Sequence, residues 1–261
     1  MADGHGSIDI PGWLYYGFTM LRTRLLLAAG AALILLVSSG CSDKLTQLTG
    51  LTDADLLARG ERNAERKKYG EASKAFQVLL ERFPTSPLAV RAQFGLASSR
   101  MANKEEAEAE VAFNDFLRLY PSDPKVPDAL FLKGKMLSRQ ALPPGRDQGK
   151  TQEAIKAYTL FLEREKDSPR AREADLKIRE LRNRLALHEA AVVNHYLSRK
   201  LYDSAEVRAR RAVASYPDVP ASPTLLSLLV QALEKEGKKD EAGTWRKTLA
   251  EKYPEHKVKK R

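Results

Sequence analysis

The segment Tyr69-Gly-Glu-Ala-Ser-Lys-Ala-Phe-Gln-Val-Leu-Leu-Glu-Arg-Phe-Pro84 places an alanine and a proline twelve residues apart, at Ala72 and Pro84. The same pairing recurs at three further places: Ala109 with Pro121, Ala205 with Pro217, and Ala242 with Pro254. Neighbouring pairs are 37 residues apart in both halves of the chain, and a weaker middle copy contains Ala154 and Pro169. Apolar residues at helical spacing between short Gly or Pro breaks predict paired helices, and no convincing alternating strand is present.

This pattern resembles the tetratricopeptide repeat, a helix-turn-helix unit of about 34 residues. A small residue at the helix crossing lets two backbones approach closely, and an aromatic four residues later lies one turn further along the same face. The resemblance implies an all-α superhelical solenoid whose repeats bury their apolar faces only against their neighbours. We expect five repeats in the array 56–255, at roughly 56–86, 88–123, 126–169, 188–219 and 223–255. A loop at 141–149 interrupts the third repeat, and a long helix is expected at about 170–200.

Residues 1–40 have the pattern of an export signal. Thirteen apolar residues, Leu25–Val37, follow Arg22 and Arg24 and precede small residues. At about 1.5 Å each they span roughly 20 Å, short of the ~30 Å hydrocarbon core, so a transmembrane helix is the weaker alternative. Met20 directly precedes this signal, and we expect it to be the true start.

The signal ends in Val37-Ser-Ser-Gly-Cys41, which resembles the lipobox of bacterial lipoproteins. The resemblance implies lipidation of Cys41, followed by a polar linker over 41–55, and Ser42 favours sorting to the outer membrane. Acyl chains that bury dozens of CH₂ groups at about 0.8 kcal/mol each would anchor the protein permanently. The alternative is an unpaired cysteine of an export signal. A single cysteine excludes an internal disulfide and CxxC sites.

The chain is basic, with 44 Lys and Arg against 34 Asp and Glu and a formal net charge of +10. This balance favours acidic partners or an anionic membrane surface. Export argues against nucleic acid, which a secreted chain seldom meets. The basic tail at 256–261 either touches lipid head groups or is a solvated end.

No catalytic motif is present. His188-Glu189 resembles the start of the HExxH zinc motif, but Val192 occupies the second histidine position and His195 lies two helical turns beyond His188. The sequence lacks GxGxxG, GxxxxGK[ST] and GxSxG motifs. We therefore expect no enzymatic activity, no metal site and no cofactor other than the lipid on Cys41.

The long helix and the repeat after it carry a more specific pattern. It consists of Leu181-Arg-Asn-Arg-Leu-Ala186, His188-Glu189, Val192, Tyr196, Arg199, Tyr202, Ala205, Arg208 and Tyr216-Pro217-Asp218. This pattern closely resembles the BamD, or ComL, lipoprotein family, from the lipobox to about Pro254. The resemblance implies a non-enzymatic subunit of the β-barrel assembly (BAM) machinery, held by lipid at the periplasmic face of the outer membrane. It implies three kinds of partner: a BamA-like barrel subunit, other lipoproteins of the complex, and unfolded outer-membrane proteins as clients.

The resemblance also assigns candidate docking residues. Arg208 matches the family's arginine that contacts the barrel subunit, where a carboxylate would accept its guanidinium. Five further residues match the same pattern and either dock or brace the helix pair: Arg199, Tyr202, His188, Glu189 and Tyr196.

The family's client-receiving region corresponds to the first two repeats, around the turn Arg82-Phe-Pro-Thr-Ser-Pro87. We expect an aromatic and basic concave groove there, formed by Phe83, Phe94, Tyr69 and Arg91, that covers an extended client weakly and reversibly. The alternative is that these aromatics belong to the core. A competing class, exported tetratricopeptide scaffolds for division or peptidoglycan of the YbgF/CpoB kind, shares the fold but lacks the Leu181–Ala186 string.

Overall fold

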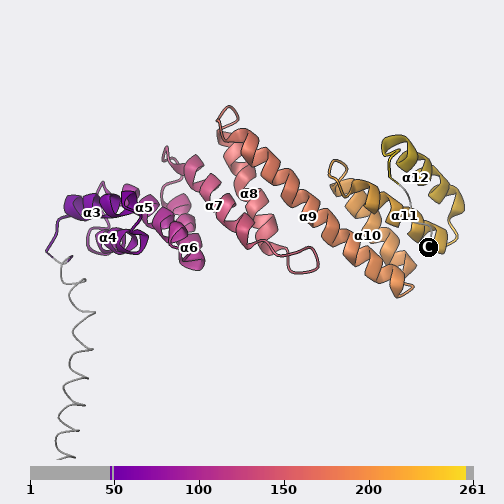
Figure 1. Cartoon of the computed structure of the whole chain (residues 1–261), viewed down its shortest axis with the longest axis horizontal. Helices are drawn as coiled ribbons and strands as arrows, with labels where there is room; N and C mark the ends of the chain where they lie inside the picture. The colour runs from indigo at the N-terminus through magenta and orange to yellow at the C-terminus, as the bar shows by residue number, and fades with distance from the viewer. Residues whose placement is uncertain (1–47, 49, 257–261) are drawn as a thin grey trace, which may run out of the picture. The chain divides into compact units, whose positions relative to one another are not determined.

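The protein is all-helical in the part that the structure, a computed structural model, describes, namely residues 48 and 50–256. That part contains ten α-helices and no β-strand, which confirms the predicted fold class (Figure 1). The helices are α3 (Asp53–Glu65), α4 (Tyr69–Arg82), α5 (Ala89–Ala102), α6 (Glu106–Leu119), α7 (Val126–Gln140), α8 (Gly149–Arg164), α9 (Ala171–Ser198), α10 (Tyr202–Ser215), α11 (Ser222–Lys235) and α12 (Lys239–Lys252).

From Leu57 onward the described residues form one compact unit, which contains most of α3 and all of α4 to α12. Within that unit, each helix from α4 onward packs against the next one in the chain. The 28-residue helix α9 packs against α7 and α8 and also against α10 and α11, so it connects the third repeat to the last two (Figure 1). Its bounds lie inside the range of 170–200 that the sequence predicts.

The first helix of four repeats ends in the same turn. The second residue after the helix has a positive φ in each case: 58° at Lys67, 64° at Lys104, 59° at Lys200 and 83° at Gly237. The next residue's N–H then donates to the carbonyl five residues earlier, as Lys68 does to Asn63 at 2.8 Å and Lys238 does to Leu233 at 2.9 Å. This six-to-one hydrogen bond is the Schellman helix end, which favours glycine because a Cβ is strained in the left-handed region.

The second helices also share one ending. The residue that follows each of them has φ between −129° and −138° and ψ between 54° and 64°, at Phe83, Tyr120, Glu165, Tyr216 and Tyr253. A proline follows in four of the five cases, and proline moves the residue before it out of the helical region. The repeated proline therefore ends the second helix.

The repeat alanines lie in the core at every crossing, with Ala72, Ala109, Ala154 and Ala205 fully buried and Ala242 only 1% exposed. Large aromatics fill the N-terminal repeats, where Phe76, Phe113, Phe116, Tyr158 and Phe161 are all buried. The C-terminal core instead consists mainly of alanine, valine and leucine from α9 to α12. Burial of these faces against neighbouring helices is the main stabilising contribution.

The export signal, Cys41 and the linker up to residue 47 lie outside the described residues, as does the tail from 257 onward. Within residues 48 and 50–256, no helix has both the length and the apolar character required to cross a bilayer.

Candidate functional site

The segment Leu181–Ala186 lies on α9 and contacts the last two repeats. Leu181 and Ala186 are buried in the core. Arg182 donates to the Asp218 carboxylate at 2.7 Å and to the Ser215 carbonyl at 3.2 Å. The side-chain oxygen of Asn183 accepts the Ala221 N–H at 2.8 Å. Arg182 and Asn183 thus fix the turn between α10 and α11.

The same helix also holds the loop of the third repeat. Arg184 donates to the carbonyls of Ala141 and Leu142 at 2.7 and 3.0 Å, and Nδ1 of His188 lies 2.6 Å from the Pro144 carbonyl. Inside the loop, the buried Gln148 amide donates to three backbone carbonyls. His188, a predicted docking residue, therefore already binds within the chain.

Arg208 forms an ion pair inside the protein. Its guanidinium donates from two nitrogens to the two carboxylate oxygens of Glu189, which joins α10 to α9. The side chains are 34% and 19% exposed, respectively. The hydrogen bond from Arg208 to Glu189 raises the pKa of the guanidinium. The sequence predicted an acidic partner on another subunit, and the structure places a carboxylate of this chain opposite Arg208.

The remaining docking candidates differ in exposure. Tyr196 is half-buried and packs against the C-terminal core. Arg199 is exposed at the end of α9, and Tyr202 is half-buried as the first residue of α10. The structure thus brings Glu189 and Arg208 together on facing helices and leaves Arg199 at the adjacent turn.

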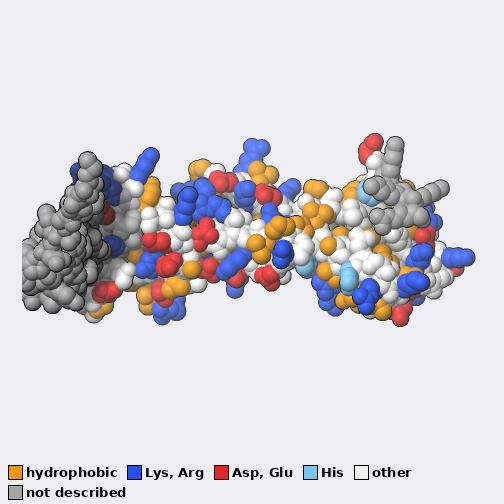
Figure 2. Space-filling view, turned by 60° about the horizontal axis from the view of Figure 1, so that its bottom comes forward, with side chains coloured by type: hydrophobic (Ala, Val, Ile, Leu, Met, Phe, Trp, Pro, Cys, Tyr) orange, Lys and Arg blue, Asp and Glu red, His pale blue; other side chains and the backbone are white. Residues whose placement is uncertain are grey.

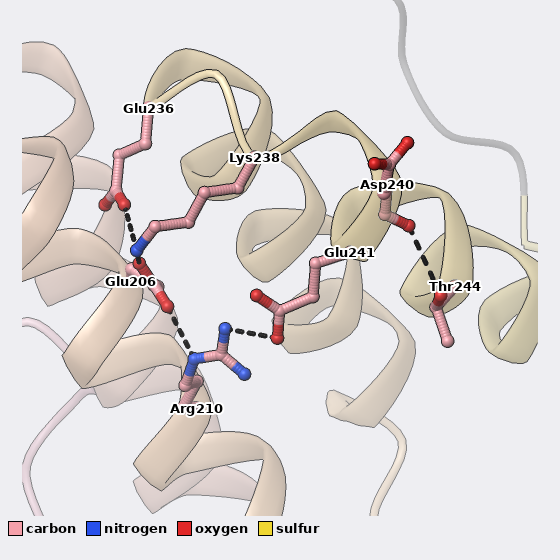
Figure 3. A network of polar contacts seen from close by, with 7 residues as sticks. All are labelled: Glu206, Arg210, Glu236, Lys238, Asp240, Glu241 and Thr244. Carbon is pink, nitrogen blue, oxygen red and sulfur yellow. Dashed lines mark hydrogen bonds and ion pairs between the residues drawn. The ribbon is translucent and has the colours of Figure 1, made fainter.

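A polar network that the sequence analysis missed joins α10 to α12 (Figure 3). The buried Glu206 carboxylate accepts hydrogen bonds from Arg210 at 2.6 Å and Lys238 at 2.5 Å. Arg210 also binds Glu241, and Lys238 also binds Glu236. Burial by itself would raise the pKa of Glu206, but hydrogen bonds from Lys238 and Arg210 outweigh it and lower the pKa to about 2. Burial raises the pKa of Glu236.

A hollow of about 640 Å³ lies among α3, α5 and the turn before α7. Its apolar lining comes from Ala64, Phe76, Val90, Phe94 and Pro124. Phe94 packs edge-on against Phe116, with ring centroids 5.6 Å apart. This hollow is the strongest candidate for a binding site in the N-terminal repeats, because concave, mostly apolar cavities of this size are typical of ligand sites.

The four predicted groove residues do not share this hollow. Phe94 and Arg91 line it, whereas Tyr69 lines a separate, polar hollow of about 680 Å³ beside the turn between α3 and α4. Phe83 lines neither, and the Arg82 guanidinium lies 4.9 Å from its ring centroid. The expectation of a basic groove is also wrong for this hollow, whose lining holds two cations, Arg91 and Lys125, against three carboxylates.

Charges of both signs are interspersed over the face that Figure 2 shows, rather than gathered into one basic patch. Within residues 48 and 50–256, no group of three or more His, Cys, Asp or Glu side chains is placed to hold a metal ion.

The sequence matches one family model and is similar to several named proteins. The outer membrane lipoprotein family YfiO matches residues 50–249. The outer membrane protein assembly factor BamD of Neisseria meningitidis serogroup A is 28% identical over 246 residues, which cover 90% of this chain and 92% of that protein. The protein of the same name from Xylella fastidiosa is 25% identical over 88% of this chain and 83% of its own length. Among solved structures, MamA protein gives a TM-score of 0.36 at 17% identity, over 78% of this chain and 93% of that one.

Proposed function

Because the chain belongs to the YfiO family of outer membrane lipoproteins, we propose that it is a non-enzymatic subunit of the outer-membrane β-barrel assembly machinery. One observation carries this proposal: relatives named as assembly factors match the chain over nearly their whole length and its own. The solenoid supports it, since stacked helix pairs present an extended surface suited to protein partners.

The protein is anchored by lipid on Cys41 at the periplasmic face of the outer membrane. The support is the lipobox-like sequence Val37–Cys41, which closes the apolar run. The polar linker then separates the anchor from α3, which begins at Asp53. This places the array in the periplasm, where barrel proteins pass in unfolded form.

The C-terminal repeats dock on a BamA-like barrel subunit, with the other lipoproteins of the complex nearby. Arg208 is half-exposed on α10, and Arg199 and Tyr202 lie at the turn between α9 and α10. A partner carboxylate at Arg208 would share or replace Glu189, because a guanidinium has five N–H donors and Glu189 uses only part of them. His188 acts as a brace, since its ring already binds the 141–149 loop.

The N-terminal repeats receive unfolded barrel proteins. The hollow beside Phe94 and Arg91 offers apolar cover to one part of an extended segment. Binding there is reversible, so the client can move on to the barrel subunit.

The first test is gentle extraction of envelopes that carry a tagged copy, followed by mass spectrometry of the N-terminal peptide and of the co-purifying proteins. We expect an acylated Cys41 and a large β-barrel subunit. Division or cell-wall proteins in its place would instead support the competing exported scaffold.

Docking is tested by a charge swap. Arg208→Glu should release the barrel subunit, but it also sets two carboxylates against each other across α9 and α10. Arg208→Glu combined with Glu189→Arg restores the ion pair inside the chain, so its melting temperature should recover. If Arg208 docks, the double variant still fails to capture the barrel subunit. Recovery of capture by the double variant would show that the pair only braces the helices.

A further inference from the structure

The hollow beside Phe94 has a glycine where a side chain would otherwise fill it. A Cβ at Gly95 would lie 2.7 Å from the Phe76 ring, so only glycine lets the ring lie against α5 at this point. With Phe94 and Val90 on the same helix, the floor is apolar and open to solvent at the mouth. A hollow of about 640 Å³ accommodates a large apolar side chain together with neighbouring backbone.

Both cations of the lining already form ion pairs within the chain. Arg91 of α5 pairs with Glu61 of α3 at 2.6 Å. Lys125 pairs with Asp128 at 2.9 Å, a carboxylate that Arg170 also binds at 2.8 Å. The Nζ of Lys125 also lies 5.8 Å from the centroid of the Phe94 ring. An incoming carboxylate would therefore have to displace Glu61 or Asp128 to gain a cation.

Two carboxylates of the lining have no cationic partner. Glu65 and Asp123 form no ion pair with any residue that the structure describes. The Asp123 side chain accepts a single hydrogen bond, from the Lys125 N–H at 2.7 Å. Glu65 is the last residue of α3, where the helix dipole disfavours a negative charge. The unbalanced charge of the hollow is therefore negative.

The hydroxyl of Ser98, in contrast, is enclosed. Oγ of Ser98 lies in the lining, is inaccessible to solvent, and makes no hydrogen bond with the described residues. Buried polar atoms are nearly always hydrogen-bonded in folded proteins. Because this Oγ is inaccessible to solvent, Ser98 contributes no hydrogen-bonding group to the open surface of the hollow.

From this arrangement we infer that the hollow selects extended segments in which a large apolar side chain stands next to lysine or arginine, and that it disfavours acidic segments and free C-terminal carboxylates. The apolar side chain lies on Phe94, and the cation lies between Glu65 and Asp123. This inference rests on the proposed function, because it specifies which part of an unfolded client the N-terminal repeats take.

The test uses fluorescein-labelled peptides of equal length with a central phenylalanine, titrated with full-length protein in detergent and read by fluorescence anisotropy. Three amidated peptides carry lysine, glutamine or glutamate on both sides of the phenylalanine. A fourth ends at the phenylalanine with a free carboxylate. We expect the lysine peptide to bind about fivefold more tightly than the glutamine peptide, with the glutamate and free-carboxylate peptides weaker still. High salt should reduce these differences.

Glu65→Lys should remove or invert the preference. The matched control is Glu163→Lys, which changes the same residue type in the last turn of α8, outside the hollow. Tighter binding of the glutamate or free-carboxylate peptide, or an order that Glu65→Lys leaves unchanged, would overturn the inference and leave the proposed function standing. The inference is also overturned if an unfolded barrel protein binds and none of the peptides competes with it. If the unfolded barrel protein itself does not bind, it is client receipt that fails.

Discussion

The first two and the last two repeats share spacing and turns but fill their cores in opposite ways. Seven residues before each positive-φ turn residue, the first helix carries Gly60 and Ala97 in the N-terminal repeats and Val193 and Val230 in the C-terminal ones. Four residues after the repeat alanine, the second helix shows the reverse order. It carries Phe76 and Phe113 in the N-terminal repeats and Ala209 and Arg246 in the C-terminal ones.

The larger core side chain at these positions thus lies on the second helix in the N-terminal repeats and on the first helix in the C-terminal repeats. In the first repeat Gly60 of α3 faces the Phe76 ring, and a Cβ at this glycine would lie 2.4 Å from the ring. In the last repeat, Leu225, Leu229 and Leu233 of α11 fill the space instead. The same repeat motif therefore forms two kinds of surface. The N-terminal repeats have a hollow over a buried ring, and the C-terminal repeats have helices joined by ion pairs such as that of Arg208 with Glu189.

The strongest test of this difference replaces Gly60 of the first repeat by valine, the residue at the corresponding position 193 of the fourth repeat. Gly60→Val should destabilise the protein by about 3 kcal/mol, because the new side chain overlaps the Phe76 ring. The matched control is Gly243→Val on α12, where a Cβ meets nothing within 4 Å, and its effect should be well below 1 kcal/mol. Urea denaturation gives the unfolding free energies.

The double variant Gly60→Val with Phe76→Ala reproduces the C-terminal arrangement of Val193 and Ala209. Since the clash is then gone, its cost should be at least about 1 kcal/mol less than the sum of the single costs. If the two unfolding free-energy changes were strictly additive, the side chains at positions 60 and 76 would not compete for the same space.

The acid stability of the C-terminal repeats is a second difference. The folded pKa of Glu206, about 2, is below the ordinary value of 4.5, so its contribution is present above pH 4.5 and is lost as the pH falls toward 2. Glu236 has the opposite effect on the pH dependence of stability, because its pKa is raised in the folded protein. In a Glu236→Gln background, we expect the unfolding free energy to fall more between pH 6 and 3 with Glu206 than with Glu206→Gln, by up to about 2 kcal/mol, because Lys238 and Arg210 still lower the pKa of Glu206. Equal slopes would mean that the network does not stabilise the fold.

The smallest effect concerns the turn that both regions share. Lys104→Gly and Lys200→Gly should each stabilise the protein by about 1 kcal/mol, because both lysines have a positive φ. Gly237→Ala should cost about as much. Thermal and urea unfolding would measure these changes. Unequal gains in stability from Lys104→Gly and Lys200→Gly would show that the different cores of the two regions also affect the turn.

The candidate sites were less predictable than the fold. The sequence indicated Phe94 and Arg91 as neighbours in one groove, but it could not show that Glu61 neutralises Arg91 from thirty residues away. It likewise grouped Glu189 with Arg208 as docking residues, whereas they pair with each other across two helices. Periodicity reports which face of a helix is apolar, but it does not report which charges meet between helices.

The sequence by itself determined the repeat, because an alanine at each crossing and a proline after most second helices act locally on backbone geometry. It also set the length of α9, through an unbroken helical pattern without Gly or Pro. Only the tertiary structure decided which side chains meet. Arg182 binds the turn between α10 and α11, Arg184 binds the 141–149 loop, and Lys238 binds Glu206. The excess of carboxylates in the lining of the hollow is likewise a result of the tertiary structure. Those contacts depend on how successive helix pairs stack, and stacking brings together charges that are distant along the chain.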